Sequence, residues 1–447
     1  MNFKKDTIAG WGNYPWLDTK VAHINSSQNA KRMVLEPASI VARGLGRSYG
    51  DQAINIAGIT ALTSSLNKYQ EFDAVNGVLK CESGVSLNEI ITHFAPLGWF
   101  PFICPGTKFI TIGGAIANDI HGKAHHVDGS FVNCVVSFET IIANGEILSA
   151  SRHENSDLFW ASFGGLGLLG IIVTATIQLR KIETTFFKTK AIQTKNLDHL
   201  LDAIDEADKT YNYSVAWIDS MAQGQSIGRG VLSLGNAATL TDLPTTFSNN
   251  PLQIGKKSKI KLPIYFPEFA LNNFSVRILN KIIHYTQSNA PEISHYEKFF
   301  FPLDAIHDWN KGYGKRGFIQ YQFVIPEENG RKNIRTVLQK ISTSGCVPFL
   351  NVLKKFGPEQ GILSFPFKGY TFAIDFPVTQ PLHAFTKEMD QLVMSFGGRI
   401  YLGKDAMLDR KTFEGMYPQV DEWKIIKQKY DPLHKFQSAI GNRLGLN

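Results

Sequence analysis

The chain has 447 residues, about three times the ~150 residues of a typical domain, so its length predicts one large composite fold or two domains. Hydrophobic residues make up 43% and charged residues 19%, a balance that excludes a disordered, collagen-like or coiled-coil chain. The formal net charge of +7 suits an anionic ligand or a membrane surface. No long run of Lys and Arg and no nucleic-acid-binding motif accompanies this charge, so nucleic acid is not expected as a partner.

The four cysteines, Cys81, Cys104, Cys134 and Cys346, are far apart and have no His at metal-binding spacing. They indicate neither a metal site nor a disulfide scaffold, which favours a reducing compartment. The first residues lack the apolar core of a secretion signal, and no apolar stretch reaches the ~18 residues of a membrane span. We therefore expect a cytoplasmic or peripherally membrane-associated protein.

The first 180 residues alternate short β-branched runs with Gly-rich turns, a pattern typical of strands joined by glycine loops. One helix is expected to begin after Ser86, because Glu89 completes a capping box, and to end at Pro96 and Gly98. Residues 144–148 contain Asn-Gly and predict a hairpin with a two-residue loop.

From about residue 185 the pattern changes to strands that alternate with amphipathic helices. This rhythm predicts an antiparallel sheet covered by helices on one face. Between these elements, residues 245–290 are poorly patterned and mix lysines with apolar side chains, including Lys256, Lys257, Lys259 and Lys261. A long irregular insertion of this kind is usually a lid, a binding loop or a disordered segment.

A first glycine-rich loop, RGLGRSYGD, occupies residues 43–51 after a predicted strand. Its glycines would let successive backbone N–H groups face an anion, and Arg43 and Arg47 would add positive charge. The alternative is a tight turn with incidental arginines. The spacing matches neither a Rossmann fingerprint nor a Walker loop.

Two further glycine-rich segments follow, PGTKFITIGGAIANDIHGK at residues 105–123 and FGGLGLLGIIV at residues 163–173. Paired glycines and small residues let a flat ligand lie against the backbone, although each segment alone could be a packing device. Three such loops within ~130 residues suit one extended dinucleotide held along several strand ends.

In wording and order these motifs resemble the FAD-binding domain of the vanillyl-alcohol-oxidase / p-cresol methylhydroxylase superfamily. Within it the chain is most similar to the decaprenylphosphoryl-β-D-ribose 2-oxidases, and the similarity continues through FIQYQFVIP, LSFP, DFP and YLGKD in the second half. The resemblance implies an α+β fold with two domains. Residues 1–185, rejoined by 405–447, would bind FAD, and residues 186–404 would form an antiparallel-sheet substrate domain with a mobile insertion at 245–290.

The resemblance also implies a flavoprotein oxidoreductase of cell-wall biosynthesis, which oxidises the 2′-hydroxyl of a polyprenyl-phosphoryl ribose by hydride transfer to flavin N5. Its partners would be this lipid-linked sugar, an NAD-dependent keto-sugar reductase that completes an epimerisation, and the membrane surface. One alternative is a sugar, alditol or aldonolactone oxidase that acts on a soluble substrate. Another is a flavin-binding or polyanion-binding module without oxidation chemistry.

The family match assigns roles to particular residues. Lys404 and His121 are the expected catalytic residues, since a positive charge and an imidazole beside the flavin could assist proton removal. Tyr49, Lys123, Gln320, Gln322, Lys354, Thr371 and Lys404 are expected to bind substrate. Gln320 and Gln322 share one face of a strand, where the alternative is a polar outer surface, and Lys354 could instead be exposed like Lys355. The residues expected to bind FAD are Arg43, Gly44, Leu45, Gly46, Arg47, Ser48, Tyr49, Gly106, Thr107, Gly113, Gly114, Ala117, Asn118, His121, Gly122, Lys123, Gly170 and Ile172.

Two positions depart from the family pattern. Covalent-flavin members carry a His where this chain has Arg47, so the resemblance implies a non-covalent FAD. Mycobacterial members carry a Cys two residues before the Asp of the DFP motif, where this chain has Ala373. That thiol is a target of covalent inhibitors and not a required catalyst, so its loss affects inhibition more than activity.

Overall fold

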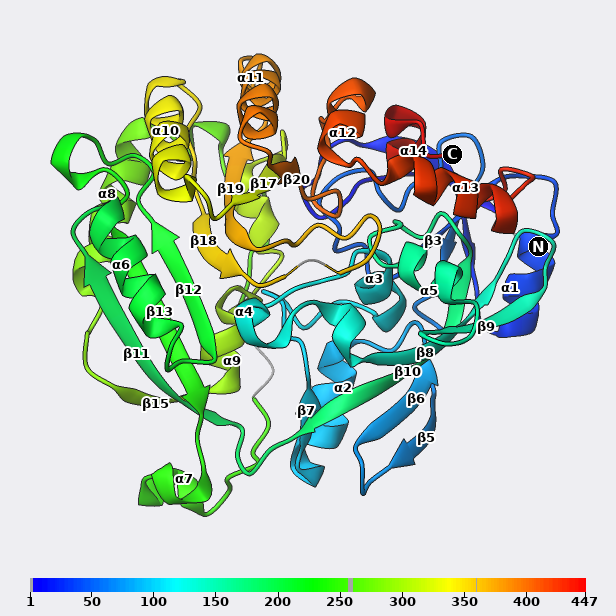
Figure 1. Ribbon diagram of the computed structural model, residues 1–447, viewed down its shortest axis with the longest axis horizontal. Helices are drawn as coiled ribbons and strands as arrows, with labels where there is room; N and C mark the ends of the chain where they lie inside the picture. Colours follow the sequence, from blue (N-terminus) through cyan, green and yellow to red (C-terminus); the bar gives the residue numbers. More distant parts are fainter. Residues whose placement is uncertain (1–2, 256–259, 359) are drawn as a thin grey trace.

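Three large β-sheets organise the chain (Figure 1). The computed structural model describes residues 3–255, 260–358 and 360–447. Helices and mostly antiparallel strands are mixed throughout, as the α+β prediction requires. Within the described part of the chain, no helix combines the length and apolarity needed to cross a bilayer.

The first sheet is built from the N-terminal residues in the order β1-β2-β4-β3. Its first pair is antiparallel and the other two pairs are parallel. Helix α1 (Ser27–Val34) buries its apolar face in a small core that this sheet shares with part of the second sheet. The strands are β1 (Lys4–Ile8), β2 (Leu17–His23), β3 (Ile40–Arg43) and β4 (Ile59–Leu62).

The second sheet is antiparallel, in the order β5-β6-β10-β8-β9, with β7 also paired to β10. The predicted helix after Ser86 is confirmed as α2 (Leu87–Phe94), and its capping box is formed by Ser86 and Glu89. The strands are β5 (Tyr69–Asp73), β6 (Val78–Glu82), β7 (Trp99–Pro101), β8 (Val135–Ile141), β9 (Ile147–Ser151) and β10 (Ile171–Lys181). The short helices are η1 (Ala95–Leu97), α3 (Ile112–Ala117), α4 (His125–Asp128), η2 (Phe131–Cys134) and α5 (Ser156–Ser162).

The predicted hairpin between β8 and β9 is confirmed, but the predicted loop length of two residues is wrong. The Ile142 N–H donates to the Glu146 carbonyl at 3.0 Å, which leaves three residues, 143–145, in the loop. Only Gly145 has a positive φ, of 82°. A three-residue loop with Gly in the left-handed region is the next most common hairpin connection, because it too matches the strand twist.

The third sheet is antiparallel and has the order β15-β11-β13-β12-β18-β19-β17-β20. Helices α6, α10 and α11 pack on one of its faces, as predicted (Figure 1). The strands are β11 (Phe186–Thr194), β12 (Tyr213–Ile218), β13 (Gly230–Ala237), β15 (Glu292–His295), β17 (Phe318–Pro326), β18 (Asn351–Phe356), β19 (Gly369–Pro377) and β20 (Arg399–Ile400). The three helices are α6 (Leu197–Ala207), α10 (Gly330–Thr343) and α11 (Leu382–Ser395).

Period-two alternation on β17 fixes which face of this sheet is apolar. Ile319, Tyr321 and Phe323 join the large core beneath the helices. Gln320 and Gln322 therefore point to the opposite face. That face is free to form the wall of a cavity.

Segment 245–290 is only partly the irregular insertion that its sequence suggests. It contains a 14-residue helix, α8, and its lysines Lys256, Lys257 and Lys259 lie outside the described residues. The mobility of the segment stays a prediction. The elements of this region are η3 (Gly224–Ser226), η4 (Leu240–Asp242), α7 (Thr245–Ser248), β14 (Ile260–Lys261), η5 (Glu268–Ala270), α8 (Asn273–Thr286), α9 (Tyr296–Phe300), η6 (Pro302–Ala305), β16 (Ile306–His307) and η7 (Trp309–Tyr313).

The C-terminal helices return to the N-terminal half of the chain, and both termini lie at the same end of the molecule (Figure 1). These helices are α12 (Arg410–Met416), α13 (Val420–Tyr430) and α14 (Ala439–Leu444). The indole of Trp423 donates to the Ala161 carbonyl at 2.9 Å, and the buried Lys427 ammonium donates to the Leu168 carbonyl at 2.8 Å. The division into units 1–185 with 405–447 and 186–404 stays a prediction.

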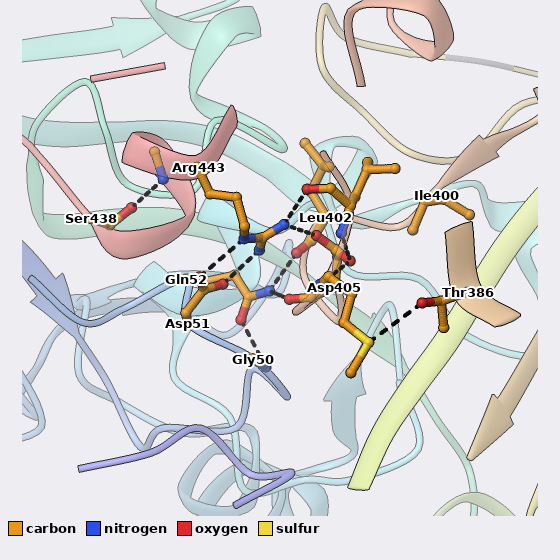
Figure 2. Close-up of polar contacts among 12 residues, drawn as sticks. Gly50, Asp51, Gln52, Thr386, Ile400, Leu402, Asp405, Ser438 and Arg443 are labelled. Carbon is orange, nitrogen blue, oxygen red and sulfur yellow. Dashed lines mark hydrogen bonds and ion pairs between the residues drawn. The ribbon is translucent and has the colours of Figure 1, made fainter. Parts of the chain in front are cut away.

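A buried ionic network joins α14 to two loops from opposite ends of the chain (Figure 2). Arg443 donates to Asp51 at 2.8 Å and to Asp405 at 2.7 Å. Beside it, the Gln52 side-chain amide donates to the Leu402 carbonyl at 2.6 Å. Burial alone would lower the pKa of Arg443, but the Asp405 and Asp51 carboxylates outweigh it and raise that pKa, so the guanidinium stays charged.

We predict that Arg443→Met lowers the free energy of unfolding by roughly 3 kcal/mol, because it leaves two buried carboxylates without their counter-charge. Urea denaturation of the purified protein measures this loss. The matched control is Arg410→Met, because the Arg410–Glu414 pair is exposed and should change stability by no more than about 0.5 kcal/mol. Equal losses in the two variants would contradict the role given to the network.

Candidate active site

One cavity of about 1040 Å³ lies between the glycine-rich loops and the third sheet. On one side its wall is formed by segments 44–49, 104–107, 110–123 and 166–172, and on the other by β11, β12, β13, β17, β18 and β19. Three loops that are separated in sequence therefore meet one sheet face across a single space. Its size and mixed lining are typical of a site for a large organic ligand.

The first loop lines the cavity from Gly44 to Tyr49. Gly46 has a φ of 64°, and a side chain on Gly44 would collide with the Thr111 hydroxyl that caps α3. Arg47 stacks on the Trp11 ring, with 3.9 Å from its guanidinium carbon to the ring centroid. Gly44 is therefore required by the close approach of this loop to α3, and Gly46 by its left-handed backbone conformation.

Arg43 is not part of the cavity wall, contrary to the expectation that it faces the anion. Its guanidinium donates instead to the Ala9 carbonyl at 2.6 Å and lies 3.5 Å from the Ala53 carbonyl. Arg43 thus holds the base of the loop. This role could not be predicted from the sequence, because an arginine that holds a loop and an arginine that binds an anion are the same residue type.

The second and third loops supply the rest of this side of the wall. All the other expected FAD-binding residues line the cavity: Gly106, Thr107, Gly113, Gly114, Ala117, Asn118, His121, Gly122, Lys123, Gly170 and Ile172. Leu166 and Gly167 also line the cavity, which the sequence analysis did not predict. Leu166 has a positive φ of 59°. A non-Gly residue in that region is uncommon and marks a sharply turned loop.

These loops fit the FAD that the resemblance implies. In the described part of the chain, the backbone N–H groups of residues 45–49 donate to no other protein group, so they remain available to phosphate oxygens. The buried Asn118 Oδ1 also has no partner there. A Cβ added to Gly106 or Gly167 would meet no atom within 4 Å, so both glycines border open space.

A chain of polar contacts crosses the sheet side of the cavity and ends at Lys404. The Lys404 ammonium donates to Gln320 Oε1, and Gln320 Nε2 donates to Asp375 Oδ1 at 2.5 Å. The Tyr313 hydroxyl donates to the other Asp375 oxygen at 2.7 Å. Burial lowers the pKa of Lys404 to about 8, against the opposing charge of Asp375, and burial raises the pKa of Asp375 to about 6.

A second set of polar contacts, centred on Gln322, lies beside the Lys404–Gln320–Asp375 contacts. Gln322 Nε2 lies 3.1 Å from His121 Nε2 and 3.0 Å from Thr371 Oγ1, whose own hydroxyl donates to the Phe323 carbonyl. Gln322 Oε1 and His121 Nδ1 have no partner among the described residues. Burial, with the charge of Lys354, lowers the pKa of His121 well below its ordinary value, so the ring is neutral.

Thr371, an expected substrate ligand, does not line the cavity. It lies behind Gln322 and holds the amide of that residue in place. Sequence reasoning missed Asp375 and Tyr313, although Asp375 belongs to the DFP motif and pairs directly with Gln320 across β17 and β19. The available signal was a polar residue opposite a glutamine in an otherwise buried pair of strands, which indicates that the two side chains interact.

Five lysines line the cavity, and burial lowers the pKa of three of them: Lys123, Lys354 and Lys404. Burial, reinforced by the charges of Lys404 and Lys123, lowers the pKa of Lys354 to about 7. Burial also lowers the pKa of Lys123 to about 8, and its ammonium donates to the Phe299 carbonyl. Mutually repelling buried cations of this kind would be relieved by a bound anion.

The neighbouring Lys355 was expected to be exposed, but the structure buries part of it. It points to the other face of β18 and pairs with Asp205 at 2.9 Å and Glu327 at 2.6 Å. Lys354 and Lys355 thus separate by strand alternation into a cavity cation and an ion-paired cation.

Tyr49 and Ala373 also line the cavity, the latter directly opposite Gln322 in the ladder. The Lys404 ammonium lies 5.3 Å from the centroid of the Tyr49 ring. His125 accepts a hydrogen bond from the Gly357 N–H, and His126 lies 3.1 Å from the Tyr211 carbonyl, which gives both histidines structural contacts.

Comparisons with known proteins agree with this arrangement. The model for an FAD-binding domain matches residues 27–151, and the model for D-arabinono-1,4-lactone oxidase matches residues 318–444. Decaprenylphosphoryl-β-D-ribose oxidase of Mycolicibacterium smegmatis is 38% identical over 98% of this chain and 97% of its own length. Cytokinin dehydrogenase 3 of Oryza sativa is 26% identical over 61% of this chain and 50% of its own length. On this evidence the chain belongs to the decaprenylphosphoryl-β-D-ribose oxidase family of FAD-dependent oxidoreductases.

Proposed function

We propose that this enzyme oxidises a secondary hydroxyl of a sugar, the 2′-hydroxyl of a polyprenyl-phosphoryl ribose, as the first half of an epimerisation to arabinose. The observation that carries the proposal is the single cavity in which the glycine-rich loops face Lys404, Gln320, Gln322 and Lys354. The name of the Mycolicibacterium smegmatis relative gives the same substrate class for that protein.

The FAD-binding loops hold the cofactor, which accepts the hydride at flavin N5 when it is bound. The free N–H groups of residues 45–49 would bind its pyrophosphate. Arg47, stacked on Trp11, offers no imidazole for a covalent bond, so the FAD is held non-covalently. We place this function in residues 1–185 with 405–447, and the substrate-binding function in residues 186–404.

Lys404 acts as a cation beside the substrate hydroxyl. Asp375 orients Gln320, and the carbonyl oxygen of Gln320 then fixes the direction of the Lys404 ammonium. The hydroxyl proton passes to solvent water in the cavity as the hydride leaves, and a positive charge held in this way stabilises the negative charge that develops on the sugar oxygen. The benefit appears mainly in the transition state, so Lys404 contributes to rate more than to binding.

His121 orients the sugar by donating a hydrogen bond and does not act as a base. Its Nε2 accepts the Gln322 amide, which leaves the proton on Nδ1. The free Nδ1–H and the free Gln322 Oε1 then offer one donor and one acceptor to sugar hydroxyls. Tyr49 borders the same part of the cavity.

Lys354, with Lys123, binds the substrate phosphate. The low pKa of Lys354, about 7, reflects its burial among like charges, and a phosphate would restore its full protonation. We further propose that the protein meets this lipid-linked substrate at a membrane surface, as a peripherally bound enzyme. An NAD-dependent reductase would then return hydride to the keto sugar.

An aldonolactone oxidase is the second candidate, because the D-arabinono-1,4-lactone oxidase model matches residues 318–444. We expect polyprenyl-phosphoryl ribose to bleach the yellow holoenzyme under anaerobic conditions, and free alditols and aldonolactones to leave it oxidised. Absorbance at the flavin band measures both. Bleaching by a lactone alone would establish the second candidate in place of the first.

We predict that Lys404→Ala retains FAD but reduces it about 10²–10³-fold more slowly, the usual cost of removing one preorganised charge. Stopped-flow bleaching with polyprenyl-phosphoryl ribose measures the rate, and the visible spectrum measures FAD content. Lys411→Ala is the matched control, because Lys411 is exposed on α12. A Lys404→Ala rate that matches this control would remove Lys404 from the mechanism.

Flavin reduction should be fastest between about pH 6 and pH 8. The charged form of Lys404 is lost as pH rises through its pKa of about 8, and the ionised form of Asp375 is lost as pH falls through about 6. The pH profile of the anaerobic bleaching rate at saturating substrate tests this. A rate that rises through pH 8 would show that Lys404 works as a neutral amine base.

A further inference from the structure

Helix α8 buries two polar side chains and exposes a row of apolar ones. Its buried side chains are Val276, Asn280 and His284, spaced four residues apart on one face. Asn280 donates to Asp219 at 2.8 Å, and His284 Nε2 lies 3.1 Å from the Thr194 carbonyl. Hydrogen bonds thus satisfy the two polar side chains on the buried face of the helix.

The opposite face forms an exposed apolar stripe of Phe274, Ile278, Ile282 and Tyr285, with Phe269 at its start. These five side chains are between 43% and 79% exposed. Spacings of four, four and three residues place the four helical members on one side of α8. A continuous exposed stripe of this kind marks an interaction surface.

Two basic side chains, Arg277 and Lys281, border the stripe. Both are exposed and form no ion pair with any described residue. An apolar face with cations along its edge is the pattern of a helix that lies in the interface of an anionic bilayer. A second copy of the chain fits less well, because pairing the stripe with itself would bring these like charges together.

The stripe leads directly to the cavity. Thr286, Gln287, Ser288, Ala290 and Pro291, which follow the stripe, all line it. Gln193 fixes this end by donating to the carbonyls of His284 and Gln287 at 2.7 and 3.0 Å. In Figure 1, α8 lies at the opposite side of the molecule from α1. The α8 end of the cavity is thus the end nearest to any surface on which the stripe docks.

We propose that the apolar stripe of α8 docks on an anionic lipid bilayer, so that a lipid-linked substrate passes from the bilayer into the cavity past residues 286–291. The substrate part of this proposal rests on the proposed function, whereas the docking surface does not. Phe274, Ile278, Ile282 and Tyr285 enter the headgroup region. Arg277 and Lys281 contact the anionic headgroups.

Flotation of the holoenzyme with phosphatidylcholine vesicles that contain phosphatidylglycerol tests the docking surface. Phe274→Glu/Ile282→Glu should reduce the vesicle-bound fraction at least about tenfold, because two apolar side chains no longer leave water. The matched control is Ile425→Glu/Leu433→Glu, which changes two apolar residues that are each 72% exposed elsewhere and should float like the wild type. Equal flotation of both double variants and the wild type would overturn the proposal.

Two further readouts guard against a variant that merely misfolds. Tyr285→Trp, in the otherwise unchanged protein, should shift its emission to the blue when anionic vesicles are added, and an unchanged spectrum would contradict docking by α8. Arg277→Glu/Lys281→Glu should abolish the preference for anionic over neutral vesicles. If the stripe variant instead dissociates a dimer seen by light scattering, and the wild type does not bind vesicles, the stripe is a contact between copies.

Activity distinguishes failure of docking from failure of the proposed function. The stripe variant should oxidise a short-chain, water-soluble polyprenyl-phosphoryl ribose like the wild type, and lose activity only on a long-chain substrate presented in vesicles. Loss on both substrates would contradict a role confined to docking. A wild type that floats but oxidises neither substrate would refute the proposed function and leave the docking surface standing.

Discussion

The ion pairs of Arg443 with Asp51 and Asp405 join two segments whose neighbouring residues, Gln52 and Lys404, line the cavity. One carboxylate is the last residue of the first glycine-rich loop and the other follows Lys404 directly in sequence, so a single guanidinium links this loop to the Lys404 segment. Removing the guanidinium or either carboxylate would leave a buried charge without its full complement of partners, so the three groups stabilise the fold as a unit. The last helix of the chain is thereby part of the active site without lining it.

Inside the cavity, burial sets the chemistry of the charged groups. Lys123, Lys354 and Lys404 line one space, and Gln320 links Lys404 to the Asp375 carboxylate, which does not line the cavity. Desolvation brings the pKa values of these groups toward neutrality, which leaves them responsive to a bound anion and to a developing oxyanion. Such a site favours a phosphorylated sugar over a neutral one.

The sequence predicted the glycine-rich loops well, because tight turns and close backbone approach demand glycine whatever the rest of the fold does. It also predicted that Gln320 and Gln322 share a face, since strand alternation is a local property. It failed where a role depends on a distant partner. The Arg43 guanidinium donates to the carbonyl of the distant Ala9. Asp375 meets Gln320 only because β19 pairs with β17.

Helix α8 shows a different limit of sequence reasoning. Its apolar residues repeat at helical spacing, but Asn280 and His284 interrupt the face that a buried helix would present, so segment 245–290 read as irregular. Hydrogen bonds to Asp219 and the Thr194 carbonyl satisfy those polar groups, and the apolar face is left outside. The same helix thus escaped prediction and carries the proposed docking surface.

In the proposed oxidation, the flavin takes the hydride from C2 of the ribose. This is tested by stopped-flow flavin reduction with polyprenyl-phosphoryl ribose deuterated at C2, compared with the same substrate deuterated at C3. We predict slower bleaching with deuterium at C2 and an unchanged rate with deuterium at C3. Slowing by deuterium at C3 alone, or no bleaching with either substrate, would contradict the account.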